Sequence, residues 1–387
     1  IRVRQNRLGL HLQKVRVKGE AVENGPISVL IVDDSALMRN LIGRIVEADP
    51  ALTVAGKAMN GAFALEKIPR LDPDIVILDL EMPEMNGIDF LKERRRLGLQ
   101  APVVILSSLA SKGAEITMEA LSLGASDFIM KPSGSASPDI RDVADSLREM
   151  IHAYGGQYRR NRRKERVPPA QPGPPRGAAP EPGEKKSVSY RPPGRFELVA
   201  LGISTGGPNA LREVFSRLDS GFPAPIVVVQ HMPPGFTAEF ARSLGRICPL
   251  EVKEAEDGDL LREGRILVAP GDRHMVVEKK PLSGLVRLLD TPAVNGHRPS
   301  ADVLFESAAR HYRNGVLGVI MTGMGRDGAR RIGDIYREGG MTLGQDEASS
   351  IVYGMPKAAF EYGFIRRQVS LGKMAETIVR LVKDPGL

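Results

Sequence analysis

The chain has 387 residues, a single cysteine and a formal net charge of +7, and 42% of its residues are apolar. This length suggests two or three domains, no apolar run reaches the ~20 residues of a membrane helix, and Cys248 alone cannot form an internal disulfide. We therefore expect a soluble cytoplasmic protein without membrane insertion.

The positive charge is concentrated in two segments. Residues 1–28 carry six Lys or Arg and two Glu (+4), and residues 152–195 carry eleven Lys or Arg and three Glu (+8). Subtracting these 12 charges from +7 leaves −5 for the rest of the chain. Because the basic segments look unfolded, no specific nucleic-acid site is expected. Residues 1–27 lack periodicity and predict a disordered N-terminal tail.

Residues 28–151 alternate short apolar runs with helical patterns such as Ala36–Glu47 and Gly87–Arg96. Short runs rich in β-branched residues are typical of strands buried on both faces. The alternation predicts βαβ units around a parallel sheet, which is a doubly wound α/β domain. The predicted strands are Val29–Val32, Thr53–Lys57, Ile75–Leu78, Val103–Leu106 and Asp127–Met130.

Three acidic residues follow two of these strands: Asp33 and Asp34 follow the first, and Asp79 follows Ile75–Leu78. The carboxyl ends of parallel strands face one crevice, so these carboxylates should converge. Close carboxylates repel one another, and a divalent cation with oxygen ligands, Mg²⁺ above all, relieves that repulsion. The alternative is that Asp33 and Asp34 cap a helix N-terminus.

Two further residues complete a polar set at four strand ends. Ser107 follows Val103–Leu106 and can donate a hydroxyl hydrogen bond to a phosphoryl oxygen, and Lys131 can supply a positive charge to the same group. A cation beside a carboxylate suits attack on phosphorus. Five polar residues at four strand ends favour a phosphoryl site over simple helix caps.

This set, together with Leu78–Pro83 and Asn86-Gly87, resembles the receiver domain of bacterial response regulators over residues 28–151. The resemblance implies a flavodoxin-like fold, with Asp79 as the phosphoacceptor and with Ser107 and Lys131 supporting the phosphoryl group.

The same resemblance implies a Mg²⁺ site. Asp34, Asp79 and the backbone carbonyl of Glu81 would hold the ion, and Asp33 would support it through water. A docking module that never takes phosphate is the alternative, and the complete acidic set argues against it.

Residues 152–195 change character. Tyr158–Arg166 is a basic run, and Val167–Gly183 is mostly Pro, Gly and Ala. Such a segment cannot bury enough apolar surface to offset its ordering entropy. We predict a flexible linker, and a coil of about 40 residues spans roughly 35 Å.

Strand–helix alternation returns over residues 196–387, which predicts a second doubly wound α/β domain. Met275–Glu278 and Val286–Leu289, with turn residues between them, predict a β-hairpin. The other predicted strands are Leu198–Gly202, Pro225–Gln230, Arg265–Ala269 and Val316–Met321.

The segment Gly202–Pro208 lies between the first of these strands and a helical pattern. Its spacing matches G-x-S-x-G, in which a sharp turn exposes the serine, here Ser204. The helix N-terminus supplies backbone N–H groups that suit an oxyanion. A phosphate-binding turn is disfavoured because the P-loop lysine and G-x-G-x-x-G spacing are missing, but a plain tight turn stays open.

A general base and an orienting acid are sought at neighbouring strand ends. His231 directly follows Pro225–Gln230 and is the predicted base, with His274 as its main rival. His297 and His311 have no strand end nearby. Asp327, in the Gly-rich turn after Val316–Met321, is the predicted acid, although an Asp-Gly turn or a helix cap would also explain it.

The order Ser, His, Asp differs from the Ser, Asp/Glu, His order of lipase-like hydrolases. Order and motifs instead resemble the chemotaxis protein-glutamate methylesterase family over nearly the whole of 196–380. The matching motifs are Gly202–Pro208, Gln230–Pro233, Ala269-Pro270 with His274, Arg298–Ser300 and Met321–Gly328.

That resemblance implies hydrolysis of glutamate γ-methyl esters on chemoreceptors, and deamidation of certain receptor glutamines, in sensory adaptation. Ser204 would attack the ester, His231 would take its proton, and Asp327 would orient the histidine. Backbone N–H groups at Thr205 and Met324 would form the oxyanion hole. No cofactor is expected in this domain, and a histidine kinase of the chemotaxis system would supply the phosphate.

We hypothesise that the unphosphorylated receiver covers the hydrolase crevice and that phosphate at Asp79 loosens this contact. Two other classes of protein compete with this reading. One is a regulated binding module without turnover, which the Ser–His–Asp set disfavours. The other is a receiver-linked transcription factor, although no helix-turn-helix pattern follows the linker.

Overall fold

The computed structural model describes residues 25–108, 111–131, 140–166, 189–281 and 283–386. Contacts divide the chain into two compact units: the described residues up to 106 and from 129 to 166 form the first, and those from 107 to 128 and from 189 onwards form the second. The predicted tail up to residue 24, and residues 167–188 of the predicted linker, lie outside the described residues. No helix in the described part of the chain is both long and apolar enough to cross a membrane.

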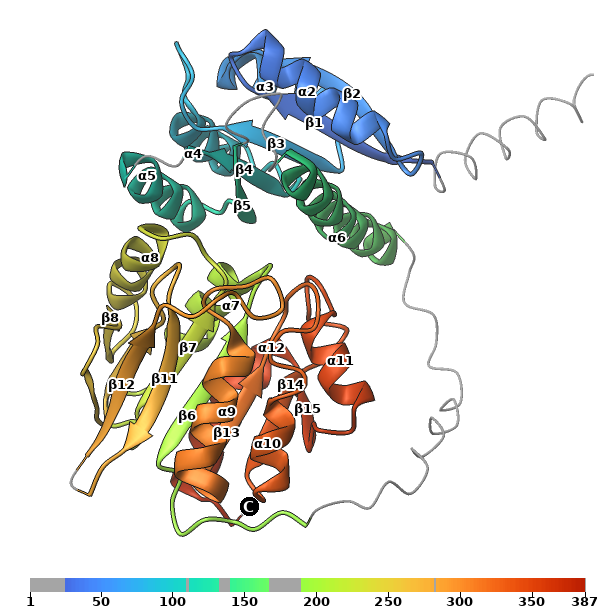
Figure 1. Ribbon diagram of the computed structural model, residues 1–387. Helices are drawn as coiled ribbons and strands as arrows, with labels where there is room; N and C mark the ends of the chain where they lie inside the picture. The colour runs from blue at the N-terminus through green and yellow to red at the C-terminus, as the bar shows by residue number, and fades with distance from the viewer. Residues whose placement is uncertain (1–24, 109–110, 132–139, 167–188, 282, 387) are drawn as a thin grey trace, which may run out of the picture. The chain divides into compact units, whose positions relative to one another are not determined.

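The N-terminal sheet has five strands in the order β2-β1-β3-β4-β5 (Figure 1). This is the flavodoxin-like order, and the pairs β1–β2, β1–β3 and β3–β4 are parallel. The predicted strands are confirmed to within two residues, because strands buried on both faces must be continuous apolar runs. The strands are β1 (Ile27–Val32), β2 (Leu52–Ala58), β3 (Ile75–Asp79), β4 (Val103–Ser107) and β5 (Asp127–Met130).

Helices follow these strands in alternation. The side chains of Ser35, Asn60 and Asn86 accept hydrogen bonds from backbone N–H groups of the first turns of α2, α3 and α4. Ser35, rather than Asp33 or Asp34, therefore caps α2, which removes the capping interpretation of the two aspartates. The helices are α2 (Ala36–Glu47), α3 (Gly61–Leu71), α4 (Gly87–Arg96), α5 (Ser111–Ser122) and α6 (Ile140–Arg166).

Helix α6 corrects the predicted start of the linker. The sequence places the end of the first domain at residue 151, but α6 continues to Arg166. Arg159 donates a hydrogen bond to the Pro26 carbonyl (2.6 Å) and pairs with Asp74 (2.8 Å), and Arg162 pairs with Asp72. The basic run thus has acidic and backbone partners far away in the sequence, which composition alone cannot reveal.

The C-terminal unit is built on a seven-stranded sheet in the order β15-β14-β13-β6-β7-β10-β8, with every neighbouring pair parallel. The predicted hairpin is confirmed as β11 (His274–Lys279) with β12 (Gly284–Leu289), and β9 (Leu260–Leu261) extends it. The sheet strands are β6 (Leu198–Ile203), β7 (Ile226–Gln230), β8 (Glu251–Glu254), β10 (Arg265–Val268), β13 (Val316–Ile320), β14 (Met341–Gln345) and β15 (Arg367–Val369).

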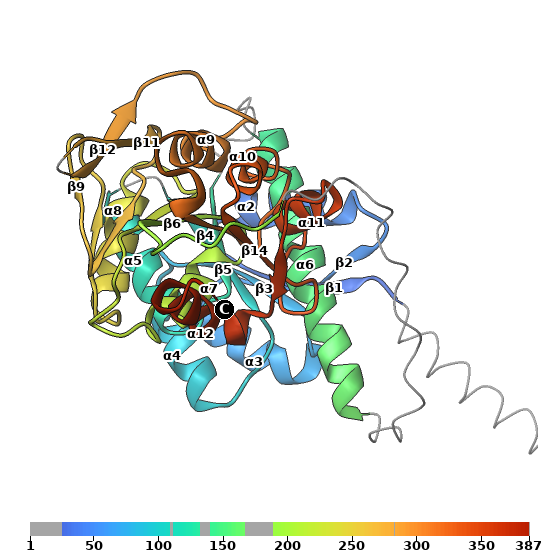
Figure 2. The ribbon, with the colours of Figure 1, turned by 90° about the horizontal axis from the view of Figure 1, so that it is seen from below.

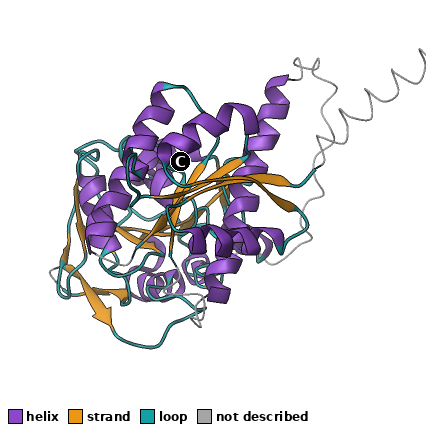
Figure 3. Ribbon diagram, turned by 90° about the horizontal axis from the view of Figure 1, so that it is seen from above, coloured by secondary structure: helices purple, strands orange, loops and turns teal. Residues whose placement is uncertain are grey.

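Helices cover both faces of this sheet, with α9 and α10 on one face and α7 and α12 on the other (Figure 2). Figure 3 distinguishes the helices (purple) from the strands (orange). Apolar side chains of α9, such as Leu304 and Phe305, are fully buried in the core beneath the sheet. The helices are α7 (Gly207–Phe215), α8 (Phe236–Gly245), α9 (Ala301–Tyr312), the 3-10 turn η1 (Arg313–Gly315), α10 (Ile332–Arg337), α11 (Met355–Glu361) and α12 (Leu371–Lys383).

The described residues before Phe196 also differ from a linker. Tyr190 donates a hydrogen bond from its hydroxyl to the Pro385 carbonyl (2.9 Å), and the Arg191 N–H bonds to the Gly339 carbonyl (3.2 Å). The C-terminal unit therefore includes residues from about 190 onwards, a few before the predicted start at 196.

Candidate active site and acidic cluster

The order of the C-terminal strands reverses at β6. The chain adds β7, β10 and β8 on one side of β6 and then places β13, β14 and β15 on the other side. Such a switch leaves a crevice at the carboxyl ends of the strands, where ligands bind in open α/β sheets. Ser204 follows β6, His231 follows β7, and Asp327 lies in the turn after β13.

The turn at Ser204 is held by its neighbours on both sides. The Ser204 N–H donates to the Thr322 carbonyl (3.0 Å), and the Ser204 carbonyl accepts a bond from Gln230 Nε2 (3.1 Å). Gly206 has φ +80°, which favours glycine, and a Cβ on Gly323 would lie 2.8 Å from the Ser204 Cβ. These glycines allow the serine turn to form and the β13 turn to pack against it.

His231 and Asp327 form a buried pair. His231 Nε2 lies 2.8 Å from Asp327 Oδ2, and the two side chains are 9% and 0% exposed. Asp327 also accepts hydrogen bonds from Ser300 Oγ (2.6 Å), the Ala301 N–H (2.6 Å) and Asn295 Nδ2 (2.9 Å). The carboxylate is thus surrounded by donors, which a buried charge requires.

These contacts decide the charge of Asp327. Burial by itself raises the pKa of the Asp327 carboxyl, but the hydrogen bond and charge of His231 outweigh it. The bonds from Ser300 and Asn295 act in the same direction, so the pKa lies far below its usual range. An ionised carboxylate in this position can hold an imidazole N–H and stabilise an imidazolium.

Ser204 and His231 follow the neighbouring strands β6 and β7, and no hydrogen bond joins their side chains. His231 Nδ1 is buried and has no hydrogen-bond partner among the described residues, and Ser204 Oγ is not bonded to it. Because Nε2 is occupied by Asp327, Nδ1 is the nitrogen left to accept a proton. Catalytic hydrogen bonds are often long in a free enzyme and shorten when substrate binds.

Thr205 and Met324 border the same turn. Within the part of the chain that the structure describes, neither backbone N–H makes a hydrogen bond. The Thr205 carbonyl accepts a bond from Thr322 Oγ1 (2.9 Å), which ties this turn to the end of β13. Two unpaired N–H groups beside a serine are suited to an oxyanion.

His274, the other candidate base, is hydrogen-bonded to backbone groups. His274 is fully buried, its Nε2 lies 3.0 Å from the Pro292 carbonyl, and its Nδ1 accepts the Ser300 N–H (3.2 Å). Both ring nitrogens thus bind backbone groups, so His274 supports the segment that reaches Asp327 and has no nitrogen left to act as the base.

The sequence analysis gave no role at the site to three residues that the structure places there. Asn295 and Ser300 bind Asp327, and the His297 ring stacks on His231 with centroids 3.8 Å apart. The Asn295-Gly296 dipeptide is a signal that could have been used, since it is typical of a tight two-residue turn. Which partners that turn reaches is not visible in the sequence.

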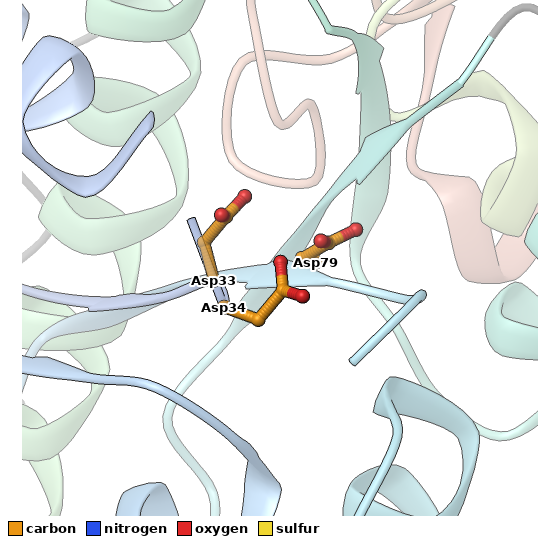
Figure 4. Close-up of side chains that lie close together, drawn as sticks. All are labelled: Asp33, Asp34 and Asp79. Carbon is orange, nitrogen blue, oxygen red and sulfur yellow. The ribbon is translucent and has the colours of Figure 1, made fainter. Parts of the chain in front are cut away.

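A second cluster lies at the carboxyl ends of β1 and β3. Asp33, Asp34 and Asp79 each place a carboxylate oxygen within 4.8 Å of the others (Figure 4). Asp33 and Asp79 are buried and Asp34 is exposed. Lys131 Nζ lies 3.2 Å from Asp33 Oδ2 and 2.7 Å from Asp79 Oδ2.

The cluster contains three carboxyl groups and one lysine, so negative charge is in excess. Burial has the largest influence on the pKa of Asp33 and raises it. The positive charge of Lys131 lowers this pKa, and the negative charge of Asp79 raises it further. Burial also disfavours the charge of Lys131, but Asp79 and Asp33 outweigh it and raise the lysine pKa. An all-oxygen donor set with surplus negative charge fits a hard divalent cation such as Mg²⁺.

The other predicted phosphoryl-site residues have these positions. The Glu81 N–H donates to Asp79 Oδ1 (3.2 Å), so the Glu81 backbone adjoins the cluster. Ser107 is the last residue of β4, and its hydroxyl is paired with Thr117 Oγ1 (2.7 Å).

Mg²⁺ is expected to raise the unfolding temperature of the N-terminal unit by several degrees, since a ligand at ten times its dissociation constant adds about 1.4 kcal/mol of stability. Asp34→Asn should remove most of this shift, because the exposed carboxylate is a candidate ligand and has no hydrogen bond or ion pair to another described residue. Calorimetry of the full chain in MgCl₂ and in EDTA measures it. Asp89→Asn, an exposed site on α4, is the control, and equal shifts in both variants would contradict the assignment.

Comparison with known proteins gives consistent matches in both parts of the chain. The CheB methylesterase family matches residues 199–378, and the response regulator receiver domain matches residues 29–141. A "Protein-glutamate methylesterase/protein-glutamine glutaminase" of Treponema denticola is 55% identical, over 92% of this chain and 99% of the relative. Relatives of the same name in Treponema pallidum and Pyrococcus abyssi are 49% and 42% identical, each over 92% of this chain and over 97% and 94% of their own lengths.

Proposed function

Because the chain belongs to the protein-glutamate methylesterase/protein-glutamine glutaminase family, we propose that its Ser204, His231 and Asp327 hydrolyse glutamate γ-methyl esters of chemoreceptors. The observation that carries this proposal is the buried His231–Asp327 pair beside the Ser204 turn, at the switch point of the sheet. As in its family, the enzyme is a hydrolase that serves adaptation in chemotaxis.

The geometry suggests how the reaction proceeds. The Ser204 hydroxyl attacks the ester carbonyl as its proton passes to His231 Nδ1, and Asp327 holds the Nε2–H and stabilises the imidazolium. The N–H groups of Thr205 and Met324 bind the oxyanion, where one donor typically lowers the barrier by ~2.7–4 kcal/mol. The imidazolium gives its proton to the methoxide oxygen, which departs as methanol, or to the amide nitrogen, which departs as ammonia when the substrate is glutamine. Water, activated by the same histidine, then releases the acyl group.

The N-terminal unit would regulate the hydrolase through phosphorylation. Asp79 is the proposed phosphoacceptor for a histidine kinase, and Lys131, already 2.7 Å from its carboxylate, would bind a phosphoryl oxygen. Ser107 would rotate from Thr117 to donate to the same group. Asp34, Asp79 and the Glu81 carbonyl would hold Mg²⁺, with Asp33 in support; the ion neutralises charge on the phosphoryl oxygens.

The proposal is tested by methanol release from methylated fragments of the cytoplasmic helices of receptors. The full chain should release methanol, and a small phosphodonor such as acetyl phosphate with Mg²⁺ should increase the rate. No methanol release under either condition would refute the methylesterase assignment for this chain.

Asp79→Asn is expected to abolish the phosphodonor effect, because an amide cannot form the acyl phosphate. The variant should take up no radioactive phosphate, and its methanol release should be the same with and without acetyl phosphate. Asp89→Asn should behave like the unchanged protein. Full stimulation of the Asp79 variant would place the phosphoacceptor elsewhere.

A further inference from the structure

A tight turn outside the proposed triad reaches both the acid and the base. The N–H of Val294 bonds to the carbonyl of His297, and the N–H of His297 bonds to the carbonyl of Val294, each over 3.0 Å. The two residues between them, Asn295 and Gly296, have φ of +54° and +79°. Positive φ at both central positions is the type I′ turn, which Asn-Gly favours. Two hydrogen bonds therefore close the turn and fix its backbone conformation.

Asn295 attaches this turn to the acid. Its Nδ2 donates to Asp327 Oδ1 (2.9 Å) and to Asp302 Oδ2 (2.7 Å). Burial is the main cause that raises the pKa of Asp302, and the Asn295 amide partly offsets it. One amide thus joins the carboxylate of Asp327 to the first turn of α9, and the position of the whole turn follows that of the acid.

His297 attaches the turn to the base. Its ring lies parallel to that of His231, with centroids 3.8 Å apart and an interplanar angle of 8°. A hydrogen bond from Nε2 to Asp327 alone would leave the His231 ring free to rock about that contact. A ring stacked on its face removes this freedom, and so the direction of Nδ1 becomes defined.

His297 does this as an uncharged ring. Burial, and then the charge of His231, lower the pKa of His297 to about 4, against the opposing effect of Asp327. Asp327 and His297 are titratable groups that contact the His231 ring. A neutral neighbour adds no second positive charge beside the imidazolium that forms during the reaction.

We propose that His297 is a positioning residue of the hydrolase site, whose stacked ring holds the His231 imidazole so that Nδ1 points toward the nucleophile. The inference rests on the proposed function for its catalytic consequence, but its structural part concerns only the orientation of His231. His297 acts through the base, on whose ring it stacks.

Two substitutions at His297 distinguish a role of its stacked ring from a role of its titratable ring nitrogens. His297→Ala removes the ring, and kcat for methanol release should fall by about 10–100-fold with KM little changed, since a misplaced base slows the chemical step more than binding. His297→Phe keeps a flat neutral ring and should retain kcat to within about threefold of the unchanged protein. His311→Ala on α9, remote from the turn, is the control and should leave both constants unchanged.

A spectroscopic measurement distinguishes failure of this inference from failure of the proposed function. In the full chain, the hydrogen-bonded Nε2–H of His231 should give a proton NMR signal protected from exchange with water. This signal should persist in His297→Phe and broaden or vanish in His297→Ala, whether or not the protein has esterase activity.

The inference is overturned if His297→Ala keeps both the unchanged kcat and the protected signal. It is equally overturned if His297→Phe is as impaired as His297→Ala, because a ring nitrogen would then be required. Absence of methanol release from the unchanged protein, with the NMR pattern as expected, would refute the hydrolase proposal and leave the positioning of His231 standing.

Discussion

Ser204→Ala is expected to lower methanol release on the order of 10⁴–10⁶-fold, because alanine has no hydroxyl with which to form the proposed acyl-enzyme. The loss should appear in kcat, while binding of the methylated receptor fragment is retained. The fold should survive, since the contacts of this turn run through the Ser204 N–H and carbonyl, which alanine keeps.

Ser216→Ala is the matched control for this prediction. Ser216 is an exposed serine at the end of α7, and its hydroxyl bonds only to the nearby Glu213 carbonyl. A fluorophosphonate probe gives a second measurement, and it should label the unchanged protein and Ser216→Ala but not Ser204→Ala. If Ser204→Ala keeps more than about 1% of the rate, the nucleophile has been misassigned.

Asp327→Asn is expected to lower kcat by about 10³–10⁴-fold while changing the shape of the side chain very little. An amide carries no charge to stabilise the imidazolium. Its NH₂ group would also face donors, among them Ser300 Oγ and the Ala301 N–H, wherever it turns. An unsatisfied donor of this kind costs about 1–3 kcal/mol, so the free energy of unfolding should fall by a similar amount.

The pH dependence of stability tests the same residue. Since contacts in the folded state hold the pKa of Asp327 below its ordinary value of 3.8, its carboxylate contributes stability that is present above pH ~4. That contribution is lost as the pH falls below ~4 toward the folded-state pKa. Urea unfolding of the unchanged protein and of Asp327→Asn should therefore give curves that converge as the pH is lowered through this range.

Asp290→Asn, an exposed aspartate paired with Arg273, is the control for both measurements. It should alter neither kcat nor the difference in stability between pH 7 and acid. A difference between Asp327→Asn and the unchanged protein that stayed constant down to pH ~2 would contradict a carboxylate with a depressed pKa.

Composition and periodicity were enough to predict the two α/β folds and most of their strands. Strands buried on both faces must be nearly continuous apolar runs, so β1, β3, β4, β6, β7 and β13 are visible in composition alone. Short or mixed strands were not predicted: β8 has one apolar residue among three charged ones, and β15 has only three residues. Ser204, His231 and Asp327 could be nominated because parallel strands deliver their carboxyl ends to one edge.

Contacts between side chains of different elements could not be predicted from these patterns. Helix α6 continues through a basic run because distant acidic and backbone groups bind its arginines. The hydrogen bond between His231 and Asp327 joins residues that are 96 positions apart in the sequence. The turn that brings Asn295 to the acid and stacks His297 on the base is likewise invisible to local pattern. Periodicity reports burial within one element, whereas hydrogen bonds and ring stacking between elements depend on how the chain returns to the same point in space.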